Sequence, residues 1–102
     1  MAHKKLVVAN WKMNKGLVES AKFAEEIKSF LEKNKNVNCD IVICPPFIAL
    51  DTVYKKTNDT DIKIGGQNCY FESNGAYTGE ISCSMLKSCG CKYVIIGHSE
   101  RR

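Results

Sequence analysis

Short apolar runs alternate with amphipathic segments along the chain. Residues 5–10 read KLVVAN, an apolar run without polar/apolar alternation, which predicts a strand buried on both faces, as in a parallel sheet. Residues 17–33 carry apolar side chains at helical spacing with charged residues between them, which predicts an amphipathic helix packed on that strand. The apolar positions of this helix are Ala21, Phe23, Ala24, Ile27, Phe30 and Leu31.

The strand and helix unit then repeats. Pro45 and Pro46 end the second apolar run, because proline donates no ladder hydrogen bond. Ser82 is placed to cap the last helix, and Gly90 to end it. The further elements predicted are strands at 39–44, 62–67 and 92–97, and helices from 47 to about 56 and from Ser82 to Gly90.

This βαβαβαβ order predicts a parallel sheet with right-handed crossovers. The local pattern does not separate a doubly wound sheet from a closed barrel. The four strands begin near residues 5, 39, 62 and 92, a mean step close to that of a (β/α)8 barrel, whose eight units need ~250 residues. On that interpretation residues 1–102 are the N-terminal part of a single TIM-barrel domain and supply four of its eight strands.

Composition narrows the class of protein. With 44% hydrophobic and 25% charged residues, the chain has the make-up of one soluble globular domain. The first five residues are followed by only four consecutive apolar ones, too few for a signal peptide or a membrane span. We therefore expect a cytoplasmic protein that does not bind a membrane.

Charge and cysteine content exclude further classes. The formal charge is +4, but the 15 basic residues are interleaved with 11 acidic ones and no nucleic-acid-binding motif accompanies them, so we expect no nucleic acid partner. A mild positive balance fits an anionic small molecule equally well. No C-x-x-C pair occurs, so reduced, mostly buried thiols are expected and a metal site is not. The six cysteines are Cys39, Cys44, Cys69, Cys83, Cys89 and Cys91.

Candidate chemistry follows the strands, because active sites of parallel α/β folds gather at the carboxyl ends of strands. Taken alone, Lys12 is most simply a solvated charge and Asn10 a turn former. His98 is equally explained by a local hydrogen bond, with Ser99 as the N-cap of a helix that starts at Glu100. A small barrel nevertheless brings the ends of strands one and four to the same mouth.

Five motifs stand in order after these strands: Asn10 to Asn14 (NWKMN), Cys44 to Phe47 (CPPF), Gly66 to Asn68 (GQN), Gly75 to Glu80 (GAYTGE) and Gly97 to Arg102 (GHSERR). In order and spacing they resemble the triosephosphate isomerase family. The resemblance covers essentially all 102 residues without a departure, and the first and last motifs are specific to the family.

The resemblance implies an isomerase that interconverts dihydroxyacetone phosphate and D-glyceraldehyde 3-phosphate through an enediol(ate), without a cofactor. It implies that Lys12 holds the phosphate and the developing oxyanion, a role that suits a compact positive charge in a dry pocket. Asn10 donates to a substrate oxygen and helps to position Lys12. His98 polarises the carbonyl and moves protons between the two oxygens, and a place at the start of a helix favours its neutral ring.

Two more residues receive roles from the resemblance alone. Glu100 is similar to a buried carboxylate that the family keeps near the lysine, although an exposed acid in a first helical turn is as natural. The long loop from about Cys69 to Glu80 is, on its own, a mobile surface loop. By resemblance it is the interdigitating loop of a homodimer, with Thr78 reaching toward the Asn10 and Lys12 of the partner.

The same resemblance places the catalytic glutamate in a later strand, beyond residue 102. The sequence is therefore expected to be a fragment, or to be completed by a second chain. Three hypotheses remain: a segment of an isomerase, an inactive half-barrel that only binds phosphate or self-associates, and an unrelated doubly wound binding domain. The absence of a Gly-rich phosphate loop after the first strand disfavours the third.

Overall fold

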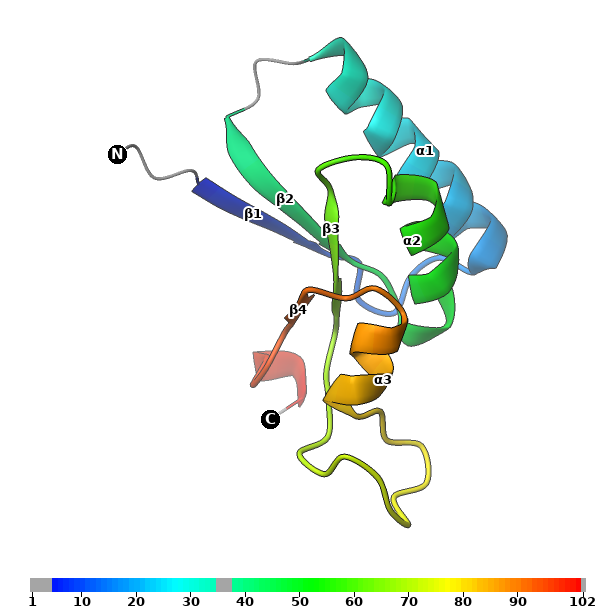
Figure 1. Ribbon diagram of the computed structural model, residues 1–102, viewed down its shortest axis with the longest axis vertical. Coiled ribbons are helices and arrows are strands. Elements are labelled where there is room, and N and C mark those ends of the chain that lie inside the picture. The colour runs from blue at the N-terminus through cyan, green and yellow to red at the C-terminus, as the bar shows by residue number, and fades with distance from the viewer. Residues whose placement is uncertain (1–4, 35–37, 102) are drawn as a thin grey trace.

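The computed structural model describes residues 5–34 and 38–101; Arg102, the last residue of the final motif, lies outside them. Four strands form one parallel sheet in the order β1-β2-β3-β4, as predicted. Each strand is therefore hydrogen-bonded to the next one along the chain, with all carboxyl ends at the same edge (Figure 1). The strands are β1 (Lys5–Asn10), β2 (Cys39–Cys44), β3 (Lys63–Gly66) and β4 (Tyr93–Val94).

Strand β1 differs from the prediction of a strand buried on both faces. Its side chains Leu6, Val7 and Val8 are exposed by 50%, 50% and 47%. The reason is its position, because β1 pairs only with β2 within the described residues and so forms one edge of the sheet.

The third and fourth strands are shorter than the predicted runs 62–67 and 92–97. Ile62 is held in a turn, where its N–H donates to Thr60 Oγ1 at 3.1 Å. Beyond the two residues of β4, Ile95 N–H still donates to the Gly66 carbonyl at 2.8 Å, before Gly97 leaves extended geometry at φ 67°. The backbone pairing between these two segments therefore continues beyond the last residue assigned to β4.

Three helices cover one side of the sheet (Figure 1). Helix α1 (Leu17–Lys33) has the predicted bounds. The helix predicted from 47 to 56 is split into a 3-10 turn, η1 (Phe47–Ala49), and helix α2 (Leu50–Thr57). The core lies between the helices and the sheet, and its buried members include Ala24, Ile43, Leu50, Val53, Ile64 and Leu86.

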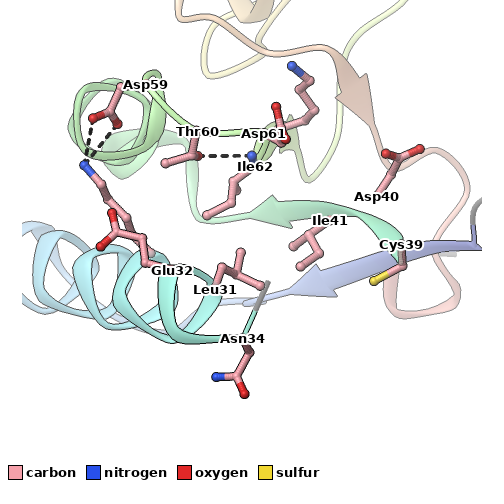
Figure 2. Close-up of a pocket in the computed structure, with 12 residues that line it drawn as sticks. Leu31, Glu32, Asn34, Cys39, Asp40, Ile41, Asp59, Thr60, Asp61 and Ile62 are labelled. Carbon is pink, nitrogen blue, oxygen red and sulfur yellow. Dashed lines mark hydrogen bonds and ion pairs between the residues drawn. The ribbon is translucent and has the colours of Figure 1, made fainter. Parts of the chain in front are cut away.

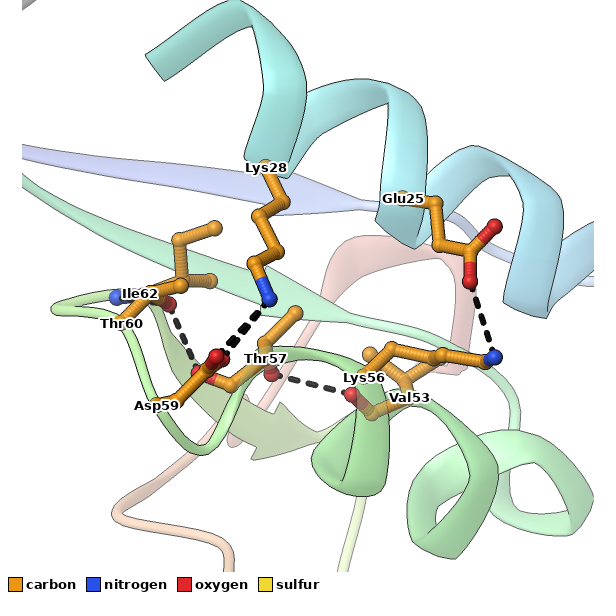
Figure 3. Close-up of polar contacts among 8 residues, drawn as sticks. All are labelled: Glu25, Lys28, Val53, Lys56, Thr57, Asp59, Thr60 and Ile62. Atoms are coloured by element: carbon orange, nitrogen blue, oxygen red, sulfur yellow. Dashed lines mark hydrogen bonds and ion pairs between the residues drawn. The ribbon is translucent and has the colours of Figure 1, made fainter. Parts of the chain in front are cut away.

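Two ion pairs join α1 to α2 and to the turn that follows it (Figure 3). Lys28 Nζ lies 3.0 and 2.9 Å from the two carboxylate oxygens of Asp59. Lys56 Nζ lies 2.8 Å from Glu25 Oε1. Exposed pairs of this kind contribute little to the free energy of unfolding, so they align the helices more than they stabilise them.

Helix α3 (Cys83–Ser88) carries both predicted caps. Ser82 Oγ accepts from Met85 N–H at 3.2 Å. At the other end Gly90 has φ 92°, with its N–H on the Lys87 carbonyl at 2.9 Å and the next N–H, of Cys91, on Leu86 at 3.0 Å. This is a Schellman ending, which needs a residue that tolerates the left-handed region.

The final turn, η2 (Ser99–Arg101), follows β4 directly. It contains Ser99 as its first residue, so Ser99 is not the cap of a helix starting at Glu100. None of the helices in the described part of the chain has the length and apolar run needed to cross a bilayer.

Candidate active site

Asn10 and Lys12 stand where β1 leaves the sheet. Trp11 N–H continues the ladder by donating to the Cys44 carbonyl at 3.1 Å. The Asn10 side chain bends toward the backbone that follows it, and its Oδ1 accepts from Lys12 N–H at 2.9 Å. Asn10 therefore fixes the backbone from which the Lys12 side chain departs.

The backbone of Lys12 lies in the left-handed region, with φ 57°. For a residue with a side chain this conformation costs about 1–2 kcal/mol, and such strain persists only where the surroundings impose it. The amide of Gln67 supplies the restraint: its Nε2 donates to the Lys12 carbonyl at 2.8 Å and to the Cys44 carbonyl at 2.9 Å. One side chain after β3 thereby ties together the ends of β1 and β2.

Gln67 has no predicted role of its own from the sequence pattern. The available signal was its place directly after a predicted strand, in the GQN motif. An amide there has two donor hydrogens and can hold two neighbouring strand ends at once.

The Lys12 side chain, which follows the outer strand β1, contacts Glu100, which follows β4 at the opposite end of the strand order. Lys12 Nζ lies 2.6 Å from Glu100 Oε1, and both side chains are 53% exposed. The hydrogen bond from Lys12 holds the pKa of the Glu100 carboxyl below its usual range. Glu100 is thus close to Lys12, as the resemblance implied, but in the described chain it is exposed and not buried.

His98, between β4 and η2, has a defined hydrogen-bonding state. Glu100 N–H donates to His98 Nδ1 at 3.1 Å. A backbone N–H is always a donor, so Nδ1 is the acceptor, and this hydrogen bond selects the tautomer of a neutral ring that holds its hydrogen on Nε2. His98, not Ser99, accepts the free N–H of this turn.

The structure therefore brings Asn10, Lys12, His98 and Glu100 to the carboxyl ends of β1 and β4. Thr78 is not among them. It is exposed in the loop that extends below α3 in Figure 1, where Tyr70 and Tyr77 pack with ring centroids 4.5 Å apart. A cation, a carboxylate and a histidine at the carboxyl ends of a parallel sheet suit binding of an anion next to a polarisable carbonyl.

Comparison with known proteins identifies the family. A family model described as triosephosphate isomerase matches residues 5–102. The chain belongs to the triosephosphate isomerase family. The triosephosphate isomerase of Clostridium novyi (strain NT) is 50% identical over 99 residues, which is 97% of this chain and 38% of that protein. The Aquifex aeolicus (strain VF5) enzyme is 46% identical over 97% of this chain and 39% of its own length.

A solved structure extends the match to three dimensions. The crystal structure of triosephosphate isomerase from Bartonella henselae aligns with a TM-score of 0.83 and 39% identity, over 98% of this chain and 40% of that one. The four parallel strands are thus the first four βα units of a TIM barrel, and the doubly wound alternative is excluded. The chain spans about two fifths of the length of the family members that it matches.

One cavity lies elsewhere, and the barrel fold explains why it is not the site. It has a volume of about 580 Å³ and opens between the end of α1 and the amino ends of β2 and β3, where Asp40 and Asp61 line it (Figure 2). In triosephosphate isomerase, as in other TIM barrels, chemistry belongs to the opposite, carboxyl face. Within the described ranges no group of three or more histidine, cysteine or acidic side chains is arranged to hold a metal ion.

The thiols differ in part from the prediction of mostly buried cysteines. All six are free, but only Cys44 and Cys91 are buried and Cys83 is exposed. Burial raises the pKa of both buried thiols to about 11, so these two remain protonated at neutral pH and unreactive.

Proposed function

We propose that this chain is the N-terminal segment of a triosephosphate isomerase, which interconverts dihydroxyacetone phosphate and D-glyceraldehyde 3-phosphate through an enediol(ate). The observation that carries the proposal is the convergence, at the carboxyl ends of the strands, of a strained Lys12 and a His98 whose Nδ1 accepts from Glu100 N–H. Membership of the family supports the reaction class. The proposed reaction uses no cofactor.

In this proposal Lys12 binds the phosphate dianion and stabilises the oxyanion as it develops. A preorganised ammonium is effective in a water-poor site because it needs no reorganisation during the reaction. Glu100 holds Lys12 in place until substrate arrives, and Asn10 donates to a substrate oxygen from the position fixed by its bond to Lys12 N–H.

His98 acts on the other end of the substrate. Its Nε2–H donates to the carbonyl oxygen, which lowers the cost of removing a proton from the neighbouring carbon. The same nitrogen then exchanges protons with the two enediolate oxygens. The carboxylate that removes the carbon-bound proton lies outside residues 1–102 in this proposal, so the segment is inactive alone.

We further propose that the active protein is a homodimer that works in cytoplasmic glycolysis and gluconeogenesis. The exposure of the loop that contains Thr78 supports the dimer, because an ordered projecting loop with a Tyr70–Tyr77 contact is suited to insertion into a partner. Triose phosphate is the only small-molecule partner proposed.

The test is a chimera in which residues 1–102 replace the matching segment of the Clostridium novyi triosephosphate isomerase. We expect isomerase turnover from the chimera in a coupled assay, and none from the 102-residue chain. Lys12→Ala in the chimera should lower kcat/KM by roughly 10³-fold, the scale of losing one oxyanion-stabilising group. Lys63→Ala, at the amino end of β3, is the matched control and should leave kcat/KM unchanged.

A half-barrel that only binds phosphate or self-associates is the alternative, and the exposed apolar residues of β1 favour it as the state of the isolated chain. It replaces the isomerase proposal if the chimera folds as a stable dimer and still shows no turnover. An unchanged kcat/KM for Lys12→Ala would remove the role assigned to this residue.

A further inference from the structure

Two cysteines face each other at the base of the projecting loop. Cys69 follows β3 and Cys83 is the first residue of α3, and their Sγ atoms are 3.3 Å apart, with the Cys83 thiol as donor. The thirteen residues between them include the whole exposed segment 71–80. The pair lies outside the candidate active site, and neither residue has a role in the proposed reaction.

The backbone beside both thiols is held in place. Tyr70 N–H donates to the Ile81 carbonyl at 2.7 Å, and Tyr70 forms a parallel bridge with Ser82. Each cysteine is the direct neighbour of one residue of this bridge. The thiols are therefore brought together by backbone pairing, and their proximity does not depend on a single side-chain rotation.

The pair also contains the one exposed thiol among the described residues. Cys83 is exposed; Cys69 is half-buried, as are Cys39 and Cys89, whereas Cys44 and Cys91 are buried. Burial raises the pKa of Cys69 and, to about 11, the pKa of each of the two buried thiols. An oxidant in solution meets the exposed thiol first, and the second sulfur is already within reach.

We propose that Cys69 and Cys83 are an oxidation site, at which a peroxide or a low-molecular-weight disulfide converts the two thiols to an intramolecular disulfide. With hydrogen peroxide, the Cys83 thiolate attacks one oxygen, the O–O bond breaks, and a sulfenic acid and one water form. Cys69 Sγ then attacks the sulfenic sulfur, the S–O bond breaks and a second water leaves. Two electrons pass from the sulfurs to the peroxide, and the two thiol protons end in the waters.

With a small disulfide the same bond forms by two exchanges. Cys83 displaces one thiol to give a mixed disulfide, and Cys69 displaces the other. The product closes the loop covalently at its base, so the segment that contains Thr78 keeps its two ends together. This site is independent of the proposed isomerase activity, because the oxidation uses neither Lys12 nor His98.

Peptide mapping tests the pairing directly. The 102-residue chain and the chimera are treated with hydrogen peroxide or oxidised glutathione, blocked with N-ethylmaleimide, and digested with trypsin and Glu-C. This digestion places Cys69 in peptide 64–72 and Cys83 in peptide 81–87. We expect the linked pair of these peptides to be the dominant disulfide, at least tenfold above any other link, and to lose this dominance when oxidation is done in urea.

A gel assay gives an independent readout. Glu-C cleavage after Glu72 or Glu80 cuts the exposed loop, and the two fragments should stay joined without reductant and separate with it. Cys83→Ser should abolish the joining, while Cys39→Ser, the matched control, should leave it intact. If native protein gives no more of the 64–72 to 81–87 link than denatured protein, in both the chain and the chimera, the proposal is wrong.

Discussion

His98 commits one ring nitrogen to the backbone and leaves the other free. Because Nδ1 accepts from Glu100 N–H, the ring can act on a substrate only through Nε2. In the chimera, His98→Gln keeps a side chain of similar length but cannot relay a proton, so we expect kcat to fall by roughly 10²–10³-fold with KM nearly unchanged. Steady-state kinetics measure both. A strongly raised KM with unchanged kcat would show that His98 binds substrate and does not polarise it.

Gln67 carries the second prediction at this scale. Gln67→Met in the chimera removes both donors to the Lys12 and Cys44 carbonyls while preserving most of the side-chain volume. Leaving these acceptors unpaired should lower the free energy of unfolding by about 1–3 kcal/mol and release the left-handed backbone of Lys12. We expect kcat/KM to fall by roughly 10–100-fold, on the scale seen when a reacting group is misplaced by about 1 Å.

The reference for that effect is Gln67→Glu, which turns a carboxylate toward the same carbonyls and should be worse in both stability and rate. A Gln67→Met chimera with full activity would show that Lys12 keeps its conformation without the amide.

At the scale of elements, Gly90 ends α3 at φ 92°, and a Cβ at that position would lie 2.4 Å from Tyr54 Cδ1. Gly90→Ala therefore combines a left-handed penalty with overpacking against α2, and we expect a loss of about 2–4 kcal/mol in the free energy of unfolding. Urea denaturation of the chimera measures the change. Gly16→Ala is the control. Gly16 precedes α1 with φ −81°, and a Cβ built there would have no neighbouring atom within 4 Å, so the free energy of unfolding should change by no more than about 0.5 kcal/mol. Equal effects of the two substitutions would contradict this account.

The elements that sequence predicts well are those set by local pattern. Helix α1 has the bounds 17–33 that its amphipathic spacing indicates, and the caps at Ser82 and Gly90 follow from residue chemistry. The length of β4 does not follow from local pattern, because the hydrogen-bond ladder of a strand ends where the neighbouring strand ends. The exposure of β1 is also not local, since it depends on what lies beside the strand.

The same division holds for the site. The positions of Lys12 and His98 were predictable, since strand ends in a parallel sheet share one edge. The left-handed backbone of Lys12 was not, because lysine has no preference for that region and the restraint comes from Gln67, 55 residues away. The contact between Cys69 and Cys83 depends in the same way on how the loop folds back.

At the scale of the whole molecule, the described chain has two open sheet edges and an uncovered apolar face. Ile96 is 76% exposed and Val8 47%, and the unpaired backbone of an edge strand is a template for another chain. We expect the purified 102-residue chain to oligomerise, to pair with a complementary C-terminal fragment, or to remain partly unfolded. Little net stability remains when half of a core is missing.

Size-exclusion chromatography with light scattering, run beside a coupled isomerase assay, measures this. A compact, cooperatively unfolding monomer with isomerase activity would contradict the expectation. That residues 1–102 belong to one domain with the missing strands stays a prediction, which this experiment also addresses.

Trp11 is the one tryptophan of the sequence and precedes Lys12 directly. Its ring is 6% exposed, lies 5.1 Å from that of Phe23 and buries an Nε1–H that finds no acceptor among the described residues. The chain therefore carries its own fluorophore at the corner after β1, where the backbone of Lys12 takes its left-handed conformation. Because the ring is buried in the folded corner, a partly unfolded chain will emit further to the red, and a blue shift on titration of a complementary fragment will report the folding of this corner without a label.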